Sequence, residues 1–164
     1  AERFEKLDIL VANAAMLGEL APLPDVDPKI WQKTLALNLT VNWRLLRAFD
    51  AMLRKAKQAR VVFLTSRVGG EEARPYWGPY GISKAALEML ARTYALETKS
   101  VGIGVSILDP GAKRTAMRAQ AMPGEDPETL ETPDALVPML MEALTADPST
   151  LTRLEYRSWQ SGAN

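Results

Sequence analysis

Residues 60–108 read RVVFLTSRVGGEEARPYWGPYGISKAALEMLARTYALETKSVGIGVSIL, and this stretch decides the fold. It opens with an apolar, β-branched run at 60–66, which is typical of a buried strand. The segment at 81–99 is rich in Ala, Leu, Glu and Met and contains no proline, so it predicts a helix. The run at 101–108 is again apolar and predicts a further strand. A strand, a helix and a strand in this order predict a parallel βαβ unit.

The flanking segments extend this alternation. Upstream, the apolar run at 7–13 predicts another buried strand, and the residues at 28–57 predict a long helix that Asp27 caps. Downstream, a shorter amphipathic helix is expected at 133–144, whereas the tail at 147–164 receives no assignment. The expected fold class is therefore α/β, with helices covering a parallel sheet.

Composition restricts the class of protein. The chain has 164 residues, of which 47% are hydrophobic, enough to bury the core of one domain. Twenty basic residues balance twenty acidic ones, and neither sign forms a long block, so no nucleic-acid partner is expected. No apolar run is long enough to cross a bilayer, and residues 1–6 show no signal-peptide pattern, so we expect a cytoplasmic protein with no membrane partner.

The chain contains neither cysteine nor histidine. This absence removes Ser-His-Asp and Cys-His chemistry and the commonest metal ligands, so no metal site is expected. Any proton transfer must use Tyr, Lys, Asp or Glu side chains.

The residues that could perform chemistry follow the predicted strands. In parallel sheets of this kind, ligands bind at the carboxyl ends of the strands, where Asn13, Ser66 and Pro110-Gly111 all fall. Ser66 could hydrogen-bond a substrate oxygen there, although a serine before two glycines is also typical of a simple turn.

Tyr80 and Lys84 lie four residues apart at the start of a predicted helix, which places both side chains on one face. A nearby ammonium stabilises tyrosinate, so we expect Lys84 to lower the pKa of the Tyr80 phenol and to suit it to acid–base work. The alternative is that both are ordinary surface residues of a helix.

Asn38 interrupts an apolar part of the long predicted helix. Asparagine is a weak helix former, so its presence indicates a buried hydrogen-bonding role, a position on the helix face or a local distortion of the helix. Asn42, one turn later, is a rival candidate for the same role.

Together these segments resemble the short-chain dehydrogenase/reductase family in five motifs that occur in the family's order. They are DILVANAA at 8–15, LNLT at 37–40, FLTSRVGG at 63–70, YGISKAALEMLARTYALE at 80–97 and ILDPGAKRTAM at 107–117. The resemblance implies a Rossmann-like doubly wound parallel sheet and an NAD(P)-dependent oxidoreductase that interconverts an alcohol and a carbonyl.

The resemblance also implies roles for the catalytic residues. Tyr80 would be the general acid/base, and Lys84 would lower its pKa while holding the nicotinamide ribose. Ser66 would polarise the substrate carbonyl, and Asn38 would support a water-linked proton relay to Lys84.

The implied cofactor is NAD or NADP. Its site would be formed by residues from several motifs, namely Asn13, Ala14, Tyr80, Lys84, Pro110, Gly111 and Thr115. Members of the family often associate through two long helices, so a homodimer or homotetramer through 28–57 and 78–99 is implied.

The sequence departs from the family's pattern in four places. At the C-terminus, LTRLEYRSW at 151–159 stands in for the family's last strand but lacks its Gly-containing ending. ANAA at 12–15 replaces the first asparagine and the final glycine of the family's motif. Ser66 lies fourteen residues before Tyr80, one more than expected, so the loop between them must absorb a residue or Thr65 must take the role of the serine. The glycine-rich diphosphate loop and its βαβαβ half are absent, so residues 1–164 are interpreted as one partial Rossmann-fold domain.

This interpretation has a physical consequence for the strand at 7–13. It would be central in a complete sheet but here forms an apolar edge, so we expect that residues 1–164 are not an independently stable monomer unless further residues or another chain cover that edge. A truncated, non-catalytic module for oligomerisation or ligand sensing is the alternative function.

Overall fold

A computed structural model describes residues 4–148 and 150–162. In these residues, four parallel strands form one sheet in the order β1-β2-β3-β4. The strands are β1 (Ile9–Ala12), β2 (Arg60–Leu64), β3 (Gly104–Asp109) and β4 (Thr152–Glu155). The predicted parallel α/β fold is confirmed, and the fourth strand lies within the LTRLEYRSW stretch that stood in for the family's last strand.

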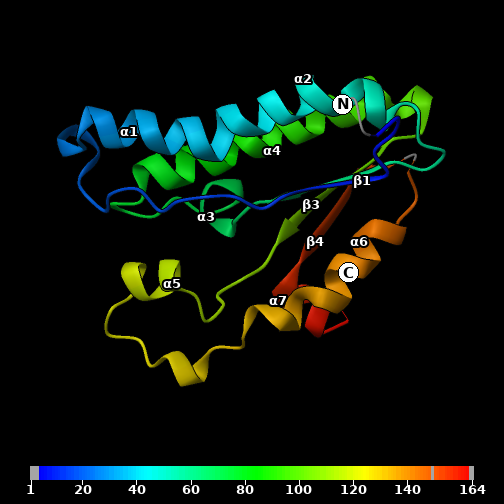
Figure 1. Cartoon of the computed structure of the whole chain (residues 1–164). Helices are drawn as coiled ribbons and strands as arrows, with labels where there is room; N and C mark the ends of the chain where they lie inside the picture. Colours follow the sequence, from blue (N-terminus) through cyan, green and yellow to red (C-terminus); the bar gives the residue numbers. More distant parts are fainter. Residues whose placement is uncertain (1–3, 149, 163–164) are drawn as a thin grey trace.

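Helices cover both faces of the sheet (Figure 1). Alternate residues of a strand point to opposite faces, so Val61 and Phe63 pack with α2 (Val41–Leu53) and α4 (Gly78–Thr98), while Val62 packs with α6 (Val137–Thr145). These two cores explain why β2 and β3 are apolar along almost their whole length.

The long helix predicted at 28–57 is present but ends four residues earlier, at Leu53. α1 (Pro28–Leu35) passes into a π-helical turn, η2 (Ala36–Thr40), and then into α2 without leaving the helical conformation. Asn38 lies in this widened turn and makes tertiary hydrogen bonds there, so both the buried hydrogen-bonding role and the local distortion expected at Asn38 are found.

Other boundaries shift by a few residues. α4 begins three residues before the predicted helix, because Gly78 and Pro79 fit its first turn. The predicted strand at 101–108 begins only at Gly104, since Gly102 adopts a left-handed conformation with φ of 73°. The helix expected at 133–144 starts as a 3-10 turn, η5 (Pro133–Leu136), before α6.

Short elements occupy the remaining connections. They are η1 (Leu23–Asp25), α3 (Arg67–Gly70), η3 (Lys99–Val101), α5 (Ala116–Ala121), η4 (Pro127–Thr129) and α7 (Tyr156–Gln160). Among the helices of the described residues, none combines the length and the apolar character that crossing a membrane requires.

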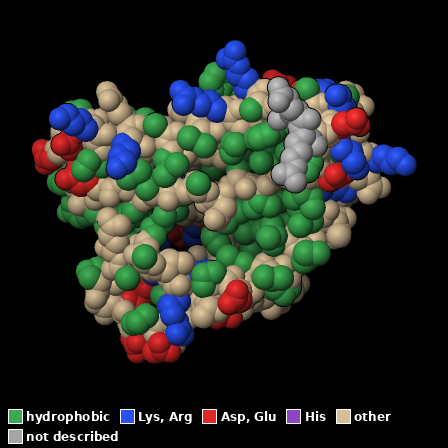
Figure 2. Space-filling view, in the orientation of Figure 1, with side chains coloured by type: hydrophobic (Ala, Val, Ile, Leu, Met, Phe, Trp, Pro, Cys, Tyr) green, Lys and Arg blue, Asp and Glu red, His purple; other side chains and the backbone are tan. Residues whose placement is uncertain are grey.

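The β1 edge of the sheet is open to solvent in this chain. Ile9 is 48% exposed and Val11 39% exposed, although both belong to a strand. Figure 2, in the orientation of Figure 1, shows hydrophobic side chains gathered across the middle of the face of the molecule that is in view. The structure therefore has the apolar edge that the sequence predicted.

Candidate active site

The carboxyl ends of the parallel strands bring the predicted site residues to one edge of the sheet. Asn13 and Ala14 follow β1 directly and are exposed, Ser66 lies two residues after β2, and Gly111 lies two residues after β3. Thr115 is further along and caps α5, where its hydroxyl accepts from the Arg118 amide at 3.2 Å. Asn13, Ala14 and Gly111 are therefore exposed residues at the carboxyl edge of the sheet.

Tyr80, Ser66 and Lys84 meet at this edge. The Tyr80 side chain is buried in the first turn of α4 and is hydrogen-bonded to the Ser66 side chain. The Lys84 Nζ lies one turn later, 5.7 Å from the centre of the Tyr80 ring, and donates to the Leu64 carbonyl at 2.8 Å. The spacing that predicted a shared face therefore places a phenol, a hydroxyl and an ammonium together.

Burial shifts the pKa values of both titratable groups toward their neutral forms. The pKa of Tyr80 is raised, chiefly by burial, with the Ser66 hydrogen bond opposing and the Asp109 carboxylate adding to the rise. The expectation of a lowered phenol pKa was wrong for this chain, because loss of solvent around the phenolate dominates. Burial likewise lowers the pKa of Lys84 to about 8, against the attraction of Asp109.

Asn38 has a fully buried side chain that joins two segments. Its Nδ2 donates to the Met16 carbonyl and to the Ser83 hydroxyl, both at 2.9 Å, while its Oδ1 accepts from the Met16 amide at 2.9 Å. Ser83 in turn donates to the Tyr80 carbonyl at 2.7 Å. Asn38 therefore fixes the segment after β1 against the first turn of α4, and its relay to Lys84 stays a prediction.

The rival, Asn42, has a different partner. Its Nδ2 donates to the Asn38 carbonyl at 2.7 Å, inside the same helical region. Asn42 thus supports the π-helical turn rather than contacting the loop after β1.

The loop between Ser66 and Tyr80 contains two left-handed positions. Gly69 has φ of 102°, and a Cβ there would overlap the Gly81 carbonyl of α4. Tyr76 has φ of 71°, which is uncommon for a residue other than glycine. The alternative residue, Thr65, donates its hydroxyl to Glu88 at 2.9 Å, whereas Ser66 faces Tyr80.

The ring of Tyr80 belongs to an apolar cluster. Buried Leu17, Val68 and Ala121 pack with it, and Trp77 contributes an edge-on ring at 5.8 Å between centroids. Met117 and Met122, which follow β3 in the sequence, are partly buried and complete the cluster beside the phenol.

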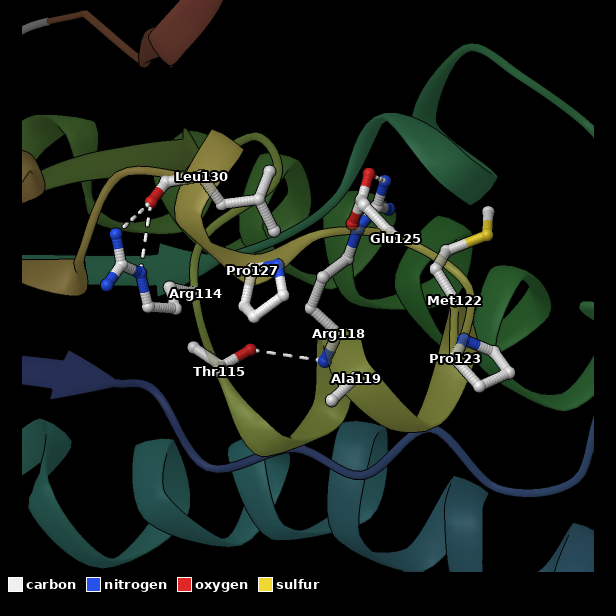
Figure 3. A pocket seen from close by; sticks show the side chains of 9 residues that line it. All are labelled: Arg114, Thr115, Arg118, Ala119, Met122, Pro123, Glu125, Pro127 and Leu130. Atoms are coloured by element: carbon white, nitrogen blue, oxygen red, sulfur yellow. Dashed lines mark hydrogen bonds and ion pairs between the residues drawn. The ribbon is translucent and has the colours of Figure 1, made fainter.

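A separate cavity of about 270 Å³ lies in the segment after β3, and Figure 3 shows the side chains around it. One wall is an ion pair in which Arg118 donates to Glu125 at 2.6 and 2.7 Å. Tyr80 and Lys84 do not line this cavity. It is therefore distinct from the acid–base group formed by Tyr80, Ser66 and Lys84.

The sequence analysis missed two acidic residues beside the acid–base group. Asp109 ends β3, is buried, and accepts from the Gly111 amide at 3.0 Å. Glu88 is buried one turn beyond Lys84. The four-residue spacing of Tyr80, Lys84 and Glu88 was the available signal for Glu88, whereas nothing local marked Asp109 as buried.

Comparisons with known proteins agree with the parallel α/β fold. A family model described as short chain dehydrogenase matches residues 1–126. The chain is 33% identical over 156 residues to the uncharacterized oxidoreductase YciK of Escherichia coli. The matched region covers 95% of this chain and 61% of that protein. The chain therefore spans about three fifths of the length of that relative.

Solved structures give the same result. A short chain dehydrogenase from Salmonella enterica serovar Typhi superimposes with a TM-score of 0.89 at 32% identity, covering 94% of this chain and 64% of that one. A short chain dehydrogenase from Escherichia coli CFT073, complexed with NADPH, gives a TM-score of 0.87 at 33% identity and covers the same shares, 94% and 64%. With the family model matching well over half of its residues, the chain belongs to the short-chain dehydrogenase family.

Proposed function

We propose that this chain carries the acid–base part of an NAD(P)-dependent oxidoreductase that interconverts an alcohol and a carbonyl. One observation carries the proposal, namely the buried Tyr80 phenol bonded to Ser66 with the Lys84 ammonium group one turn away. A carbonyl oxygen at this point would accept hydrogen bonds from two hydroxyl groups and take a proton from one of them.

Each proposed role follows from position. Tyr80 donates its proton to the carbonyl oxygen as hydride reaches the carbonyl carbon, which yields the alcohol; the reverse steps yield the carbonyl. Ser66 steadies the oxygen, and Lys84 stabilises the tyrosinate left behind. The raised pKa of Tyr80 leaves it protonated at neutral pH but makes it a weaker acid, so the proposal relies on Lys84 to stabilise the tyrosinate as the proton leaves.

A nicotinamide cofactor, NAD or NADP, supplies or accepts the hydride when bound. The exposed residues Asn13, Ala14 and Gly111 fit this group, because they follow β1 and β3 at the carboxyl edge of the sheet, where ligands bind in folds of this class. Pro110 and Thr115 would line the nicotinamide and diphosphate. The complex of the Escherichia coli CFT073 relative with NADPH supports the class of cofactor but leaves the choice between NAD and NADP open.

The test is to measure NADH and NADPH binding by titration calorimetry, and carbonyl reduction over a substrate panel, with the full-length protein. We expect binding of one cofactor and turnover, and a loss of kcat of about a hundredfold or more in Tyr80→Phe with the cofactor affinity retained. Tyr94→Phe is the matched control, since Tyr94 lies on the same helix and donates to Asp50. Cofactor binding without turnover would instead favour the ligand-sensing alternative.

We also propose that the full-length protein is a homodimer or homotetramer through the long helices at 28–57 and 78–99. The support is a line of exposed apolar side chains on α4, where Ile82 is 42%, Met89 64% and Leu96 78% exposed at intervals of seven residues. Trp43 of α2 is a further exposed aromatic side chain. Apolar and aromatic side chains of this kind are typical of the core of an interface.

Light scattering after size exclusion tests this interface. Leu96→Glu is expected to lower the molar mass to that of the monomer, because a carboxylate would be buried without a partner. Leu23→Glu is the control, since Leu23 is also exposed but lies in η1. An unchanged mass in Leu96→Glu would contradict the helix interface.

A further inference from the structure

Three successive turns of α4 contact three consecutive residues at the end of β2. Tyr80 is hydrogen-bonded to Ser66, Lys84 donates to the Leu64 carbonyl at 2.8 Å, and Glu88 accepts from the Thr65 hydroxyl at 2.9 Å. The first two contacts belong to the acid–base group already described. The third contact holds Thr65, which lies between Leu64 and Ser66 in the sequence.

Burying the Glu88 carboxylate costs free energy that a merely space-filling role would not explain. The Glu88 side chain is 6% exposed, and an apolar residue of similar volume would avoid the cost of burying a carboxylate. Gly70 packs so closely that a Cβ at that position would overlap the Glu88 carboxylate. The backbone of α3 therefore leaves room for this carboxylate against the end of β2.

The Glu88 carboxylate also reaches the last strand. Arg153 of β4 lies 3.5 Å from Glu88 Oε1, and the same guanidinium pairs with Glu155 at 2.7 Å and with Glu71 at 3.2 Å. Glu88 thus joins β2, α4 and β4 at the carboxyl edge of the sheet. A movement of its carboxylate would be transmitted to Thr65.

We infer that Glu88 is a positioning residue that acts through Thr65 to fix the Ser66 hydroxyl against the Tyr80 phenol. The inference rests on the proposed function, since it assigns a part in the same acid–base chemistry. Thr65 transmits the effect because its amide is also held, donating to the Leu108 carbonyl of β3 at 2.9 Å. With backbone and side chain both held, the adjoining residue has little freedom to move away from Tyr80.

The experiment removes the Thr65–Glu88 hydrogen bond in the full-length protein while keeping the volume. Thr65→Val deletes the donor, and Thr65→Ser restores it. The control is Thr98→Val, because Thr98 is equally buried on α4 but donates only to the Tyr94 carbonyl of its own helix. The expected result is a fall in kcat of about tenfold in Thr65→Val, with KM for the cofactor nearly unchanged and with recovery in Thr65→Ser.

The partner is tested separately. Glu88→Gln keeps an oxygen that can accept from Thr65, whereas Glu88→Leu has none. We expect Glu88→Gln to retain most of kcat and Glu88→Leu to match Thr65→Val. If Glu88→Leu fails to fold, Thr65→Val and Thr65→Ser still decide the inference.

A second readout does not depend on turnover. The titration of Tyr80 is followed by tyrosinate absorbance, as the difference between each variant and its Tyr80→Phe counterpart. Because the Ser66 hydrogen bond lowers the pKa of Tyr80, displacement of Ser66 in Thr65→Val is expected to raise that pKa, with no change in Thr98→Val. If neither the Tyr80 titration nor kcat changes in Thr65→Val, the inference is overturned. If the wild type shows no activity but the Tyr80 titration still shifts in Thr65→Val, the result counts against the proposed function alone.

Discussion

At the scale of single residues, burial governs the chemistry of the acid–base group. Tyr80 and Lys84 are both largely withdrawn from solvent, so the phenol is harder to ionise and the ammonium is easier to deprotonate than in water. Asp109 opposes the effect on Lys84 and reinforces the effect on Tyr80, because a carboxylate favours a cation and disfavours an anion nearby. This one carboxylate therefore acts on both groups.

The lowered pKa of Lys84 predicts a dependence of stability on pH. The folded-state pKa is about 8 and the ordinary value is 10.5, so between these values the unfolded chain binds more protons and stability rises with pH. The free energy of unfolding of the full-length wild type, relative to Lys84→Met, should rise by up to about 3 kcal/mol across this window. Urea denaturation over a pH series measures it, and a difference that stays flat would contradict the buried lysine.

The position of Asp109 predicts a shift in the titration of Tyr80. Asp109→Asn removes the carboxylate while keeping an oxygen for the Gly111 amide, so the pKa of Tyr80 should fall. Tyrosinate absorbance, taken as the difference from the Tyr80→Phe counterpart, measures the change. Asp134→Asn, at an exposed position in η5, is the control and should leave the titration unmoved.

At the scale of elements, the segments between regular structure determine where the side chains proposed as catalytic meet. The π-helical turn η2 lets Asn38 reach Met16 and Ser83 at once. The short helix α3 returns the chain from Ser66 toward α4, and Gly69 allows the two backbones to approach. Both features place side chains of distant segments around Tyr80.

The close approach at Gly69 predicts a large effect of one added carbon. Gly69→Ala places a Cβ on a left-handed backbone and makes it overlap the Gly81 carbonyl. The substitution should therefore lower the free energy of unfolding of the full-length protein by about 1–3 kcal/mol or more. Gly124→Ala is the matched control, since no atom lies within 4 Å of a Cβ there. Denaturant unfolding compares the two, and equal midpoints would show that α3 moves away from α4 without cost.

At the scale of the whole molecule, the four-stranded sheet ends in an apolar edge. β1 has no partner strand on its outer side and exposes the side chains of Ile9 and Val11, while the strand at the other edge, β4, is equally short and carries charged side chains. Exposed apolar strand edges pair with other chains, and charged edge residues oppose such pairing. The two ends of the sheet therefore differ in their tendency to associate.

This difference predicts the behaviour of residues 1–164 expressed alone. In a Leu96→Glu background, which removes the proposed helix interface, the piece should still self-associate in light scattering. Adding Val11→Lys should reduce the association, whereas adding Leu20→Lys, at an exposed leucine outside the strands, should not. A monodisperse monomer that unfolds cooperatively would show that β1 needs no neighbour.

Much of this protein was determined by the sequence alone. Apolar runs of strand length alternating with helical segments predicted the parallel sheet, because these patterns are local and strong. The spacing of Tyr80 and Lys84 placed both on one helix face for the same reason. The family was identified from motifs in a fixed order, and the family model confirms it.

The tertiary structure decided what depends on contacts between distant residues. Three features follow from partners far away in the sequence. They are the π-helical turn at Asn38, the pairing of the fourth strand with β3, and the position of Ser66 rather than Thr65 beside Tyr80. The direction of the Tyr80 pKa shift was wrong in the sequence analysis, because the spacing of two residues carries no information on how much solvent reaches them. Local pattern fixes which side chains share a face, and only packing fixes their surroundings.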